Sequence, residues 1–143
     1  QKGVLSVEKK LFVETNNGTN RQIRPVTPEQ PLRIGDKVIV RLTIRTDREM
    51  NYVFLKDLRA GCFEPADQLS GPESRDGIWY YRSPKDVSEN FFINRLPEGT
   101  FVLEYPVYVS RSGEYAGGIS TIQCMYAPEF VSHTAGESLR IMP

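Results

Sequence analysis

Alternation of apolar and polar residues with a period of two dominates this chain. Between Lys37 and Arg45, Val38, Val40, Leu42 and Ile44 take every second position, and charged or hydroxyl residues take most of the others. Successive side chains of a strand point to opposite faces, so the pattern predicts a half-buried β-strand. The same alternation runs over Phe101–Val109. The β-branched and aromatic residues that strands prefer predict further strands at Val4–Glu14, Tyr52–Lys56, Ile78–Arg82, Phe91–Asn94, Ile119–Tyr126 and Ser138–Met142.

Turn-forming residues separate these segments. Asn17-Gly18 favours a type I′ hairpin turn, because both residues tolerate a positive φ. Short loops between strands are predicted at Pro97–Gly99 and Arg111–Gly113. The longest loop is predicted at Leu69–Gly77, where serine, glycine, proline and charged residues gather.

The pattern as a whole indicates an all-β fold. Helical signals are weak, and at most one helical turn is expected after Ser83. Pro106 falls inside a strong strand pattern and cannot donate to a ladder, so that strand should be an edge or carry a bulge. About eight or nine short strands with frequent turns predict an antiparallel β-sandwich of the immunoglobulin-like type.

Length and charge narrow the function classes. The 143 residues are enough for one domain, residues 1–143, with a core that needs no metal or disulfide in order to fold. Lysine plus arginine and aspartate plus glutamate both number 18, which argues against nucleic-acid and anionic-membrane partners. No apolar stretch approaches the roughly 18 residues that a membrane span requires. Because the chain starts at Gln1 without an initiator methionine, we expect a module excised from a larger protein.

Residues that could support catalysis or metal binding are scarce. The single histidine, His133, lies nine residues beyond Cys124, and we expect it in a solvated loop rather than in a dyad with that cysteine. Two cysteines and one histidine lack the paired spacing of zinc sites. Acids such as Asp57 and Glu64 lack the order of a calcium loop and are expected in solvated loops. We therefore predict a protein that is not an enzyme and holds no cofactor or metal.

Two features leave alternatives open. In Ile78-Trp79-Tyr80-Tyr81, alternation places Trp79 and Tyr81 on one face and Tyr80 on the other. One aromatic face should be core, and the other is compatible with an independent carbohydrate- or protein-binding module. Cys62 and Cys124 are the only cysteines. Their spacing alone fits an inter-sheet disulfide and two buried free thiols equally well.

Two longer segments carry a family resemblance. The first, "LRIGDKVIVRLTIRTDREMNYVFLKDLRAGCFEP", runs from Leu32 to Pro65, and the second, "NFFINRLPEGTFVLEYPVYVSRSGEYAGGISTIQCMYAPEF", from Asn90 to Phe130. Together they resemble the C-terminal macroglobulin-like domain of bacterial alpha-2-macroglobulin family proteins, especially those of the Bacteroides type. The resemblance implies a β-sandwich at the end of a long, exported or lipid-anchored protease-trapping protein of the cell envelope, periplasmic or surface-exposed.

The resemblance also implies a role for one short segment. In the family the last domain packs against a helical domain with a thioester, and a tyrosine shields that bond from water. Met125-Tyr126-Ala127-Pro128 resembles the segment that carries this tyrosine, which makes Tyr126 and Met125 candidates for an interdomain interface. The competing interpretation is that Tyr126 packs in the domain's own core.

Other implications concern reactivity and partners. The thioester motif Cys-x-Glu-Gln is absent at Cys62 and at Cys124, so any thioester lies elsewhere in the parent protein. The residues after Ser70-Gly71 depart from the family pattern, which leaves any contact of that loop in doubt.

An envelope location favours a Cys62–Cys124 disulfide. The expected partners are other domains of the same polypeptide, with proteases as targets of the full-length protein. The isolated domain is expected to be a monomer.

Overall fold

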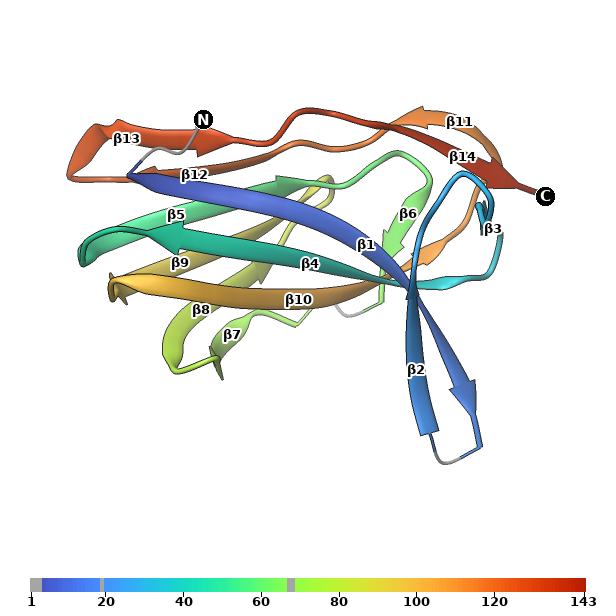
Figure 1. Ribbon diagram of the computed structural model, residues 1–143, viewed down its shortest axis with the longest axis horizontal. Helices are drawn as coiled ribbons and strands as arrows, with labels where there is room; N and C mark the ends of the chain where they lie inside the picture. Colours follow the sequence, from blue (N-terminus) through green and yellow to red (C-terminus); the bar gives the residue numbers. More distant parts are fainter. Residues whose placement is uncertain (1–3, 19, 67–68) are drawn as a thin grey trace.

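Three sheets make up the computed structural model, which describes residues 4–18, 20–66 and 69–143. The five-stranded sheet has the order β2-β1-β4-β10-β6, and the six-stranded sheet has the order β13-β12-β5-β9-β8-β7 (Figure 1). The three-stranded sheet β11-β14-β3 lies at one end of the molecule. The five-stranded sheet consists of β1 (Leu5–Asn17), β2 (Asn20–Pro25), β4 (Lys37–Thr46), β6 (Phe63–Pro65) and β10 (Gly99–Val109). The six-stranded sheet consists of β5 (Met50–Leu58), β7 (Gly71–Arg75), β8 (Ile78–Pro84), β9 (Ser88–Leu96), β12 (Ser120–Cys124) and β13 (Ala127–His133), and the three-stranded sheet of β3 (Leu32–Arg33), β11 (Gly113–Ala116) and β14 (Ser138–Met142).

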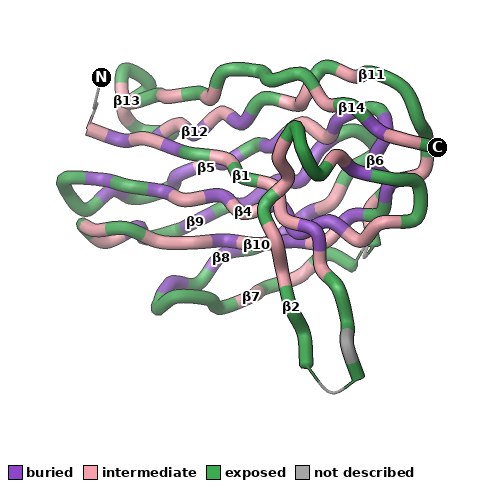
Figure 2. The backbone as a smooth tube through the Cα atoms, turned by 45° about the vertical axis from the view of Figure 1, so that its right-hand side comes forward, coloured by how far each residue is buried: buried purple, intermediate pink, exposed green. Residues whose placement is uncertain are grey.

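The two large sheets face each other as a sandwich, which confirms the predicted fold class. Buried and exposed positions alternate along the strands, as Figure 2 shows. The core lies between the inner faces and includes Leu42, Ile44 and Leu103 from one sheet and Leu55, Phe91 and Ile122 from the other, all fully buried. All pairings are antiparallel except that of β14 with β3. The described residues include no helix, and hence none long and apolar enough to span a membrane.

The strand count is higher than predicted, because short polar strands give little periodic signal. All eight predicted strands exist, but β2, β3, β6, β7, β11 and β13 were not expected. The predicted loop Leu69–Gly77 was wrong in its centre, because β7 pairs there with β8 as an exposed edge strand. A hairpin exists where it was predicted, but its turn starts one residue later: Asn17 ends β1 and pairs with Asn20, and Gly18 follows with a φ of 72°. The turn's other residue lies outside the described ones.

Pro106 occupies an edge, as predicted. It lies opposite Ile39 of β4, while β6 covers β10 on the other side only from Val107 to Val109. The missing N–H of a proline is harmless where no second strand continues the ladder.

Candidate functional site

The Met125-Tyr126 segment is the tip of a hairpin. Cys124 pairs with Ala127, so Met125 and Tyr126 form the two-residue turn between β12 and β13. Both side chains are exposed, by 55% for Met125 and 77% for Tyr126. The interpretation that Tyr126 packs in the domain's own core is therefore wrong. The turn holds two adjacent, bulky, mostly apolar side chains outside the core.

Tyr52 of β5 holds this turn in place. Its carbonyl accepts a 2.9 Å hydrogen bond from the Met125 N–H, and its ring meets the Tyr126 ring edge-on, with 4.9 Å between centroids and 65° between planes. Tyr52 has a φ of 59°, a conformation that costs a bulky residue roughly 1–3 kcal/mol. The ring pair and the hydrogen bond give Tyr126 a defined position although most of it faces solvent.

An exposed aromatic surface continues from this turn across the six-stranded sheet. We call Tyr52, Phe54, Trp79, Tyr81 and Phe92 the aromatic face. Cross-strand pairing joins Tyr81 to Phe92 and Phe92 to Phe54, and the last two rings stack with centroids 4.8 Å apart. Trp79 is 70% exposed, while Tyr80, on the opposite side of β8, is buried. The predicted division of this segment into a core face and a free face is confirmed.

The aromatic face carries few charges. Among the exposed residues of β8, β9, β5 and β12, all of which are described, the charged ones are Lys56 and Arg95, and Arg95 pairs with Glu49 at 3.0 Å. The outer face of the five-stranded sheet is the reverse, with cross-strand ion pairs Arg41–Glu104 at 2.6 Å, Arg45–Glu8 at 3.0 Å and Lys37–Glu14 at 3.3 Å. A charged face suits water, and a contiguous apolar face is typical of a surface that another protein covers. We therefore expect the outer face of the five-stranded sheet to face water and the aromatic face to contact another protein or domain.

A polar network lies inside the sandwich, and its acids were not recognised in the sequence. Asp57 lies in β5 and is fully buried, so the prediction of a solvated loop acid was wrong. Its carboxylate accepts hydrogen bonds from Lys9 Nζ at 2.7 Å, from Ser120 Oγ at 2.7 Å and from the Tyr105 hydroxyl. Burial, and next the neighbouring Asp57 charge, raise the pKa of Tyr105.

A second buried acid, Glu89, neighbours this network. It lies 2.8 Å from Arg82 Nε and 3.0 Å from Arg59 Nη1. Burial raises the pKa of Glu89, and the guanidinium groups of Arg82 and Arg59 act against that rise. Among the described residues no buried side-chain nitrogen or oxygen lacks a hydrogen-bond partner. Asp57 joins the two large sheets through Lys9 and Tyr105, whereas Glu89 bonds within the six-stranded sheet. The sequence pattern of their strands predicted neither role.

The two cysteines do not form the expected disulfide. Both are buried free thiols. Cys124 pairs with Val53 near the start of β5, whereas Cys62 precedes Phe63, which pairs with Val109 at the end of β10. They therefore lie toward opposite ends of the sandwich, and a disulfide needs Cα atoms within about 7 Å. Burial raises the pKa of the Cys62 thiol, which keeps it protonated and unreactive.

Histidine and cysteine are also not brought together. His133 ends β13 opposite Thr121 and is exposed, so it belongs to a strand rather than the predicted loop. Cys124 lies at the other end of the same hairpin and faces the core. Within the described ranges no group of three or more histidine, cysteine, aspartate or glutamate residues could hold a metal ion.

Comparison with known proteins identifies related sequences and folds. A family model described as "Bacterial Alpha-2-macroglobulin MG10 domain" matches residues 5–129. Among solved structures, the chain is similar to Salmonella alpha-2-macroglobulin reacted with methylamine, with a TM-score of 0.75 and 21% identity over 100% of this chain and 9% of that one. Trypsin-activated alpha-2-macroglobulin from Escherichia coli matches with a TM-score of 0.74 and 17% identity over 100% of this chain and 11% of that one.

Other matches span different lengths. The native Escherichia coli protein from domain MG7 to the C-terminus matches with a TM-score of 0.73 and 16% identity over 100% of this chain and 24% of that one. A Dictyostelium discoideum protein named "Circularly permutated Ras protein 2" is 28% identical over 109 residues, which are 76% of this chain and 3% of that protein. The chain therefore spans only a small part of each of these relatives.

Proposed function

Because this chain belongs to the bacterial alpha-2-macroglobulin MG10 domain family, we propose that it is a non-catalytic packing module of a longer protease inhibitor. It acts by covering a neighbouring helical domain of the thioester type in the same polypeptide. The observation that carries the proposal is the Met125-Tyr126 turn, which presents two bulky side chains to solvent from a position fixed by Tyr52.

The physical role of the turn is to exclude water. A thioester hydrolyses unless water is excluded from it. The Met125 and Tyr126 side chains can cover such a bond, while the Tyr126 hydroxyl forms a hydrogen bond with a polar group at the margin of the contact. Trp79 and the rest of the aromatic face extend the surface available for packing. The small number of charges on it, Lys56 and Arg95, supports contact with protein, because a covered charge must be desolvated or paired.

Location and targets follow from the same assignment. The parent protein is proposed to reside in the bacterial cell envelope, periplasmic or surface-exposed, and to take proteases as its targets. The Escherichia coli relatives are described as activated by trypsin and by porcine elastase. The 143-residue domain itself contributes packing and no catalysis, and alone it should be monomeric.

Reaction of the full-length parent with methylamine tests the proposal. If the parent carries a Cys-x-Glu-Gln thioester, Tyr126→Gly should raise the background rate of amine incorporation several-fold, because water and amines reach the bond. The matched control is Tyr108→Gly, since Tyr108 is 44% exposed but lies on the charged outer face of the five-stranded sheet. Equal rates for the two variants would remove Tyr126 from the interface.

A second candidate function is carbohydrate binding at Trp79. A groove of about 420 Å³ lies beside this ring and is also lined by Tyr81, Phe92 and Asn94. Flat exposed rings next to a side-chain amide can stack on a sugar and donate hydrogen bonds to it. Glycan-array binding by the isolated domain that disappears in Trp79→Ala would favour this function over interdomain packing.

A further inference from the structure

One ion pair crosses the interior of the sandwich and brings an amine into contact with a carboxyl group. Lys9 lies in β1 of the five-stranded sheet, and Asp57 lies in β5 of the six-stranded sheet. The Lys9 Nζ is 2.7 Å from the Asp57 Oδ1, where the aspartate side chain is fully buried and the lysine side chain is 13% exposed. An amine and a carboxyl group are the two components of an amide bond, and the proposed function uses neither of them.

Folding holds these two groups together, which supplies much of what their condensation lacks in bulk water. Intramolecular reactions in good geometry reach effective concentrations of about 10⁵–10⁸ M, because the entropy of bringing the groups together has already been lost. The Lys9 Nζ contacts the oxygen that is bonded to the Asp57 Cγ. A small movement of the flexible lysine side chain therefore brings the nitrogen to the carbon that it would attack.

Burial also favours the uncharged forms that can react. An ammonium and a carboxylate both lose hydration inside a protein, so a shared proton can pass from one to the other at low cost. Glu89 is buried as well and, although paired with two arginines, is close enough to repel the Asp57 charge. Transfer of a proton from Lys9 to Asp57 removes this repulsion and leaves an amine beside a carboxylic acid.

Each oxygen of Asp57 has a hydroxyl donor that suits its part in such a reaction. The Tyr105 hydroxyl donates to Oδ2, the oxygen that becomes negative when nitrogen adds to Cγ. The Ser120 hydroxyl donates at 2.7 Å to Oδ1, the oxygen that would leave. Burial, and next the Asp57 charge, raise the pKa of Tyr105, so its hydroxyl keeps the proton that it donates. Fixed donors at a developing oxyanion are a large source of rate in acyl transfer.

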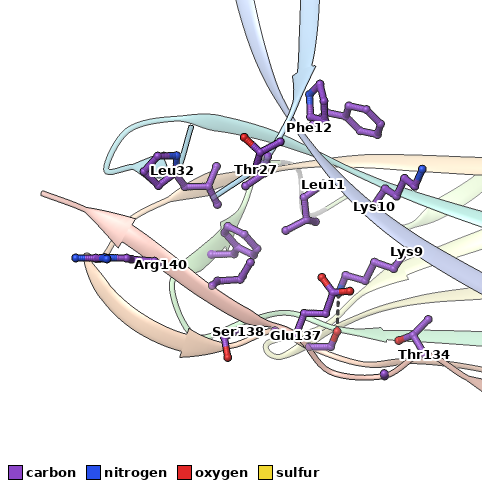
Figure 3. Close-up of a pocket in the computed structure, with 18 of the residues that line it drawn as sticks. Lys9, Lys10, Leu11, Phe12, Thr27, Leu32, Thr134, Glu137, Ser138 and Arg140 are labelled. Atoms are coloured by element: carbon purple, nitrogen blue, oxygen red, sulfur yellow. Dashed lines mark hydrogen bonds between the residues drawn. The ribbon is translucent and has the colours of Figure 1, made fainter. Parts of the chain in front are cut away.

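The water that condensation releases can leave through a cleft of about 880 Å³. Lys9 lines this cleft, and so does Gly118, whose carbonyl accepts a hydrogen bond from the Lys9 Nζ at 3.0 Å. Figure 3 shows Lys9 in the cleft together with Thr134 and Glu137. Solvent is therefore within reach on the lysine side of the pair, while the aspartate stays covered.

We propose that Lys9 and Asp57 condense to an intramolecular isopeptide bond, which joins the two large sheets covalently. The ammonium passes one proton to Oδ1, and the neutral amine adds through its lone pair to Cγ. The bond between Cγ and Oδ1 then breaks, and Oδ1 leaves as water with this proton and a second one from the nitrogen. The amide keeps one N–H and the carbonyl oxygen Oδ2. The step needs no oxidant, reductant or further reactant.

The bond would make the sandwich resistant to opening. A covalent link between residues far apart in the chain restricts the unfolded state, and proteases cleave the open form of a domain. This benefit rests on the proposed function in a protease-trapping parent, whereas the bond itself depends only on the geometry of the pair.

The intact mass of the 143-residue chain tests the proposal. After several days in the folded state at neutral pH, the mass should be lower than that of the sequence by one water molecule, and the loss should survive denaturation. A tryptic digest should contain a branched peptide that joins residues 3–10 to a peptide with residues 57–59. Trypsin would not cut after Lys9, because an amide replaces the charged amine.

Two matched variants identify the nucleophile. Lys9→Arg should keep the full sequence mass, because a guanidinium retains the charge but is always protonated and does not attack. Lys10→Arg, at the neighbouring exposed position, should lose water as the wild type does. Urea titration establishes that each variant is folded, and the branched peptide of the wild type decides the matter if Lys9→Arg does not fold.

Three results would overturn the proposal. The first is a wild-type chain that keeps its full mass after this incubation. The second is a loss of water that persists in folded Lys9→Arg. The third is a loss located at Asp76-Gly77, where an aspartate can instead cyclise onto the next backbone nitrogen, together with unlinked peptides from β1 and β5.

Discussion

Lys9 of β1 reaches across the sandwich to Asp57 of β5, with 2.7 Å between Nζ and Oδ1. The same ammonium donates to the carbonyls of Leu58 at 3.2 Å and Gly118 at 3.0 Å. All three of its protons are therefore engaged by the six-stranded sheet and the segment that enters β12. This contact joins the two large sheets.

Removal of the lysine should be costly. In Lys9→Met the fully buried Asp57 loses its cation, and an uncompensated buried charge destabilises a fold by roughly 3–5 kcal/mol. The free energy of unfolding from urea titration measures the effect. The control Lys10→Met, at the neighbouring exposed position, should stay within about 0.5 kcal/mol of the wild type. A Lys9→Met protein as stable as that control would contradict the stabilising role of the Lys9–Asp57 ion pair.

Gly118 should not tolerate a side chain. A Cβ placed there would lie 1.7 Å from the Leu58 carbonyl oxygen, so alanine would force apart the backbone segments that hold Lys9. We expect Gly118→Ala to destabilise the domain by more than about 3 kcal/mol or to prevent folding.

Gly61→Ala is the matched control for Gly118→Ala. Its Cβ would meet only the Tyr115 ring, at 3.5 Å, an ordinary contact distance. Thermal melting compares the two variants, and Gly118→Ala should melt at the lower temperature. Similar melting temperatures would show that the backbone at Leu58 moves away from an added Cβ at little cost.

Alkaline pH should reveal the burial of Tyr80. Burial, with Glu73 nearby, raises the pKa of Tyr80 to about 12. Between a usual value of about 10 and this pKa, the unfolded chain releases the proton while the folded chain keeps it, so stability falls as pH rises. The contribution is on the order of 2–3 kcal/mol. Urea titrations at pH 9 and above measure how far the free energy of unfolding falls as pH rises. This fall should be smaller in Tyr80→Phe than in the wild type. An equal fall in both proteins would show that Tyr80 does not cause the alkaline loss of stability.

The thiols should be protected by folding alone. Without reducing agent, a thiol reagent should label Cys62 and Cys124 only after the protein is unfolded, and then both of them, because they are buried and unbridged. Mass spectrometry counts the labels. A denatured, non-reduced protein that takes up no label would restore the disulfide that the family resemblance favoured.

The family resemblance was sufficient to single out Met125 and Tyr126, but the local pattern placed both of them in a strand, Ile119–Tyr126. In the structure β12 ends at Cys124, and the two residues form a hairpin turn that explains their exposure. The supporting role of Tyr52 was not predictable in this way. It depends on pairing between β5 and β12, which are far apart in the chain, and on a left-handed backbone conformation that tyrosine rarely adopts.

The sequence by itself determined the strands with a strong alternating pattern and which face of each is buried, because a period of two is a local property of the chain. Only the tertiary structure decided that Asp57 is buried beside Lys9 and that the two cysteines are apart. These facts depend on the order of strands in the sheets, which arises from contacts between distant segments.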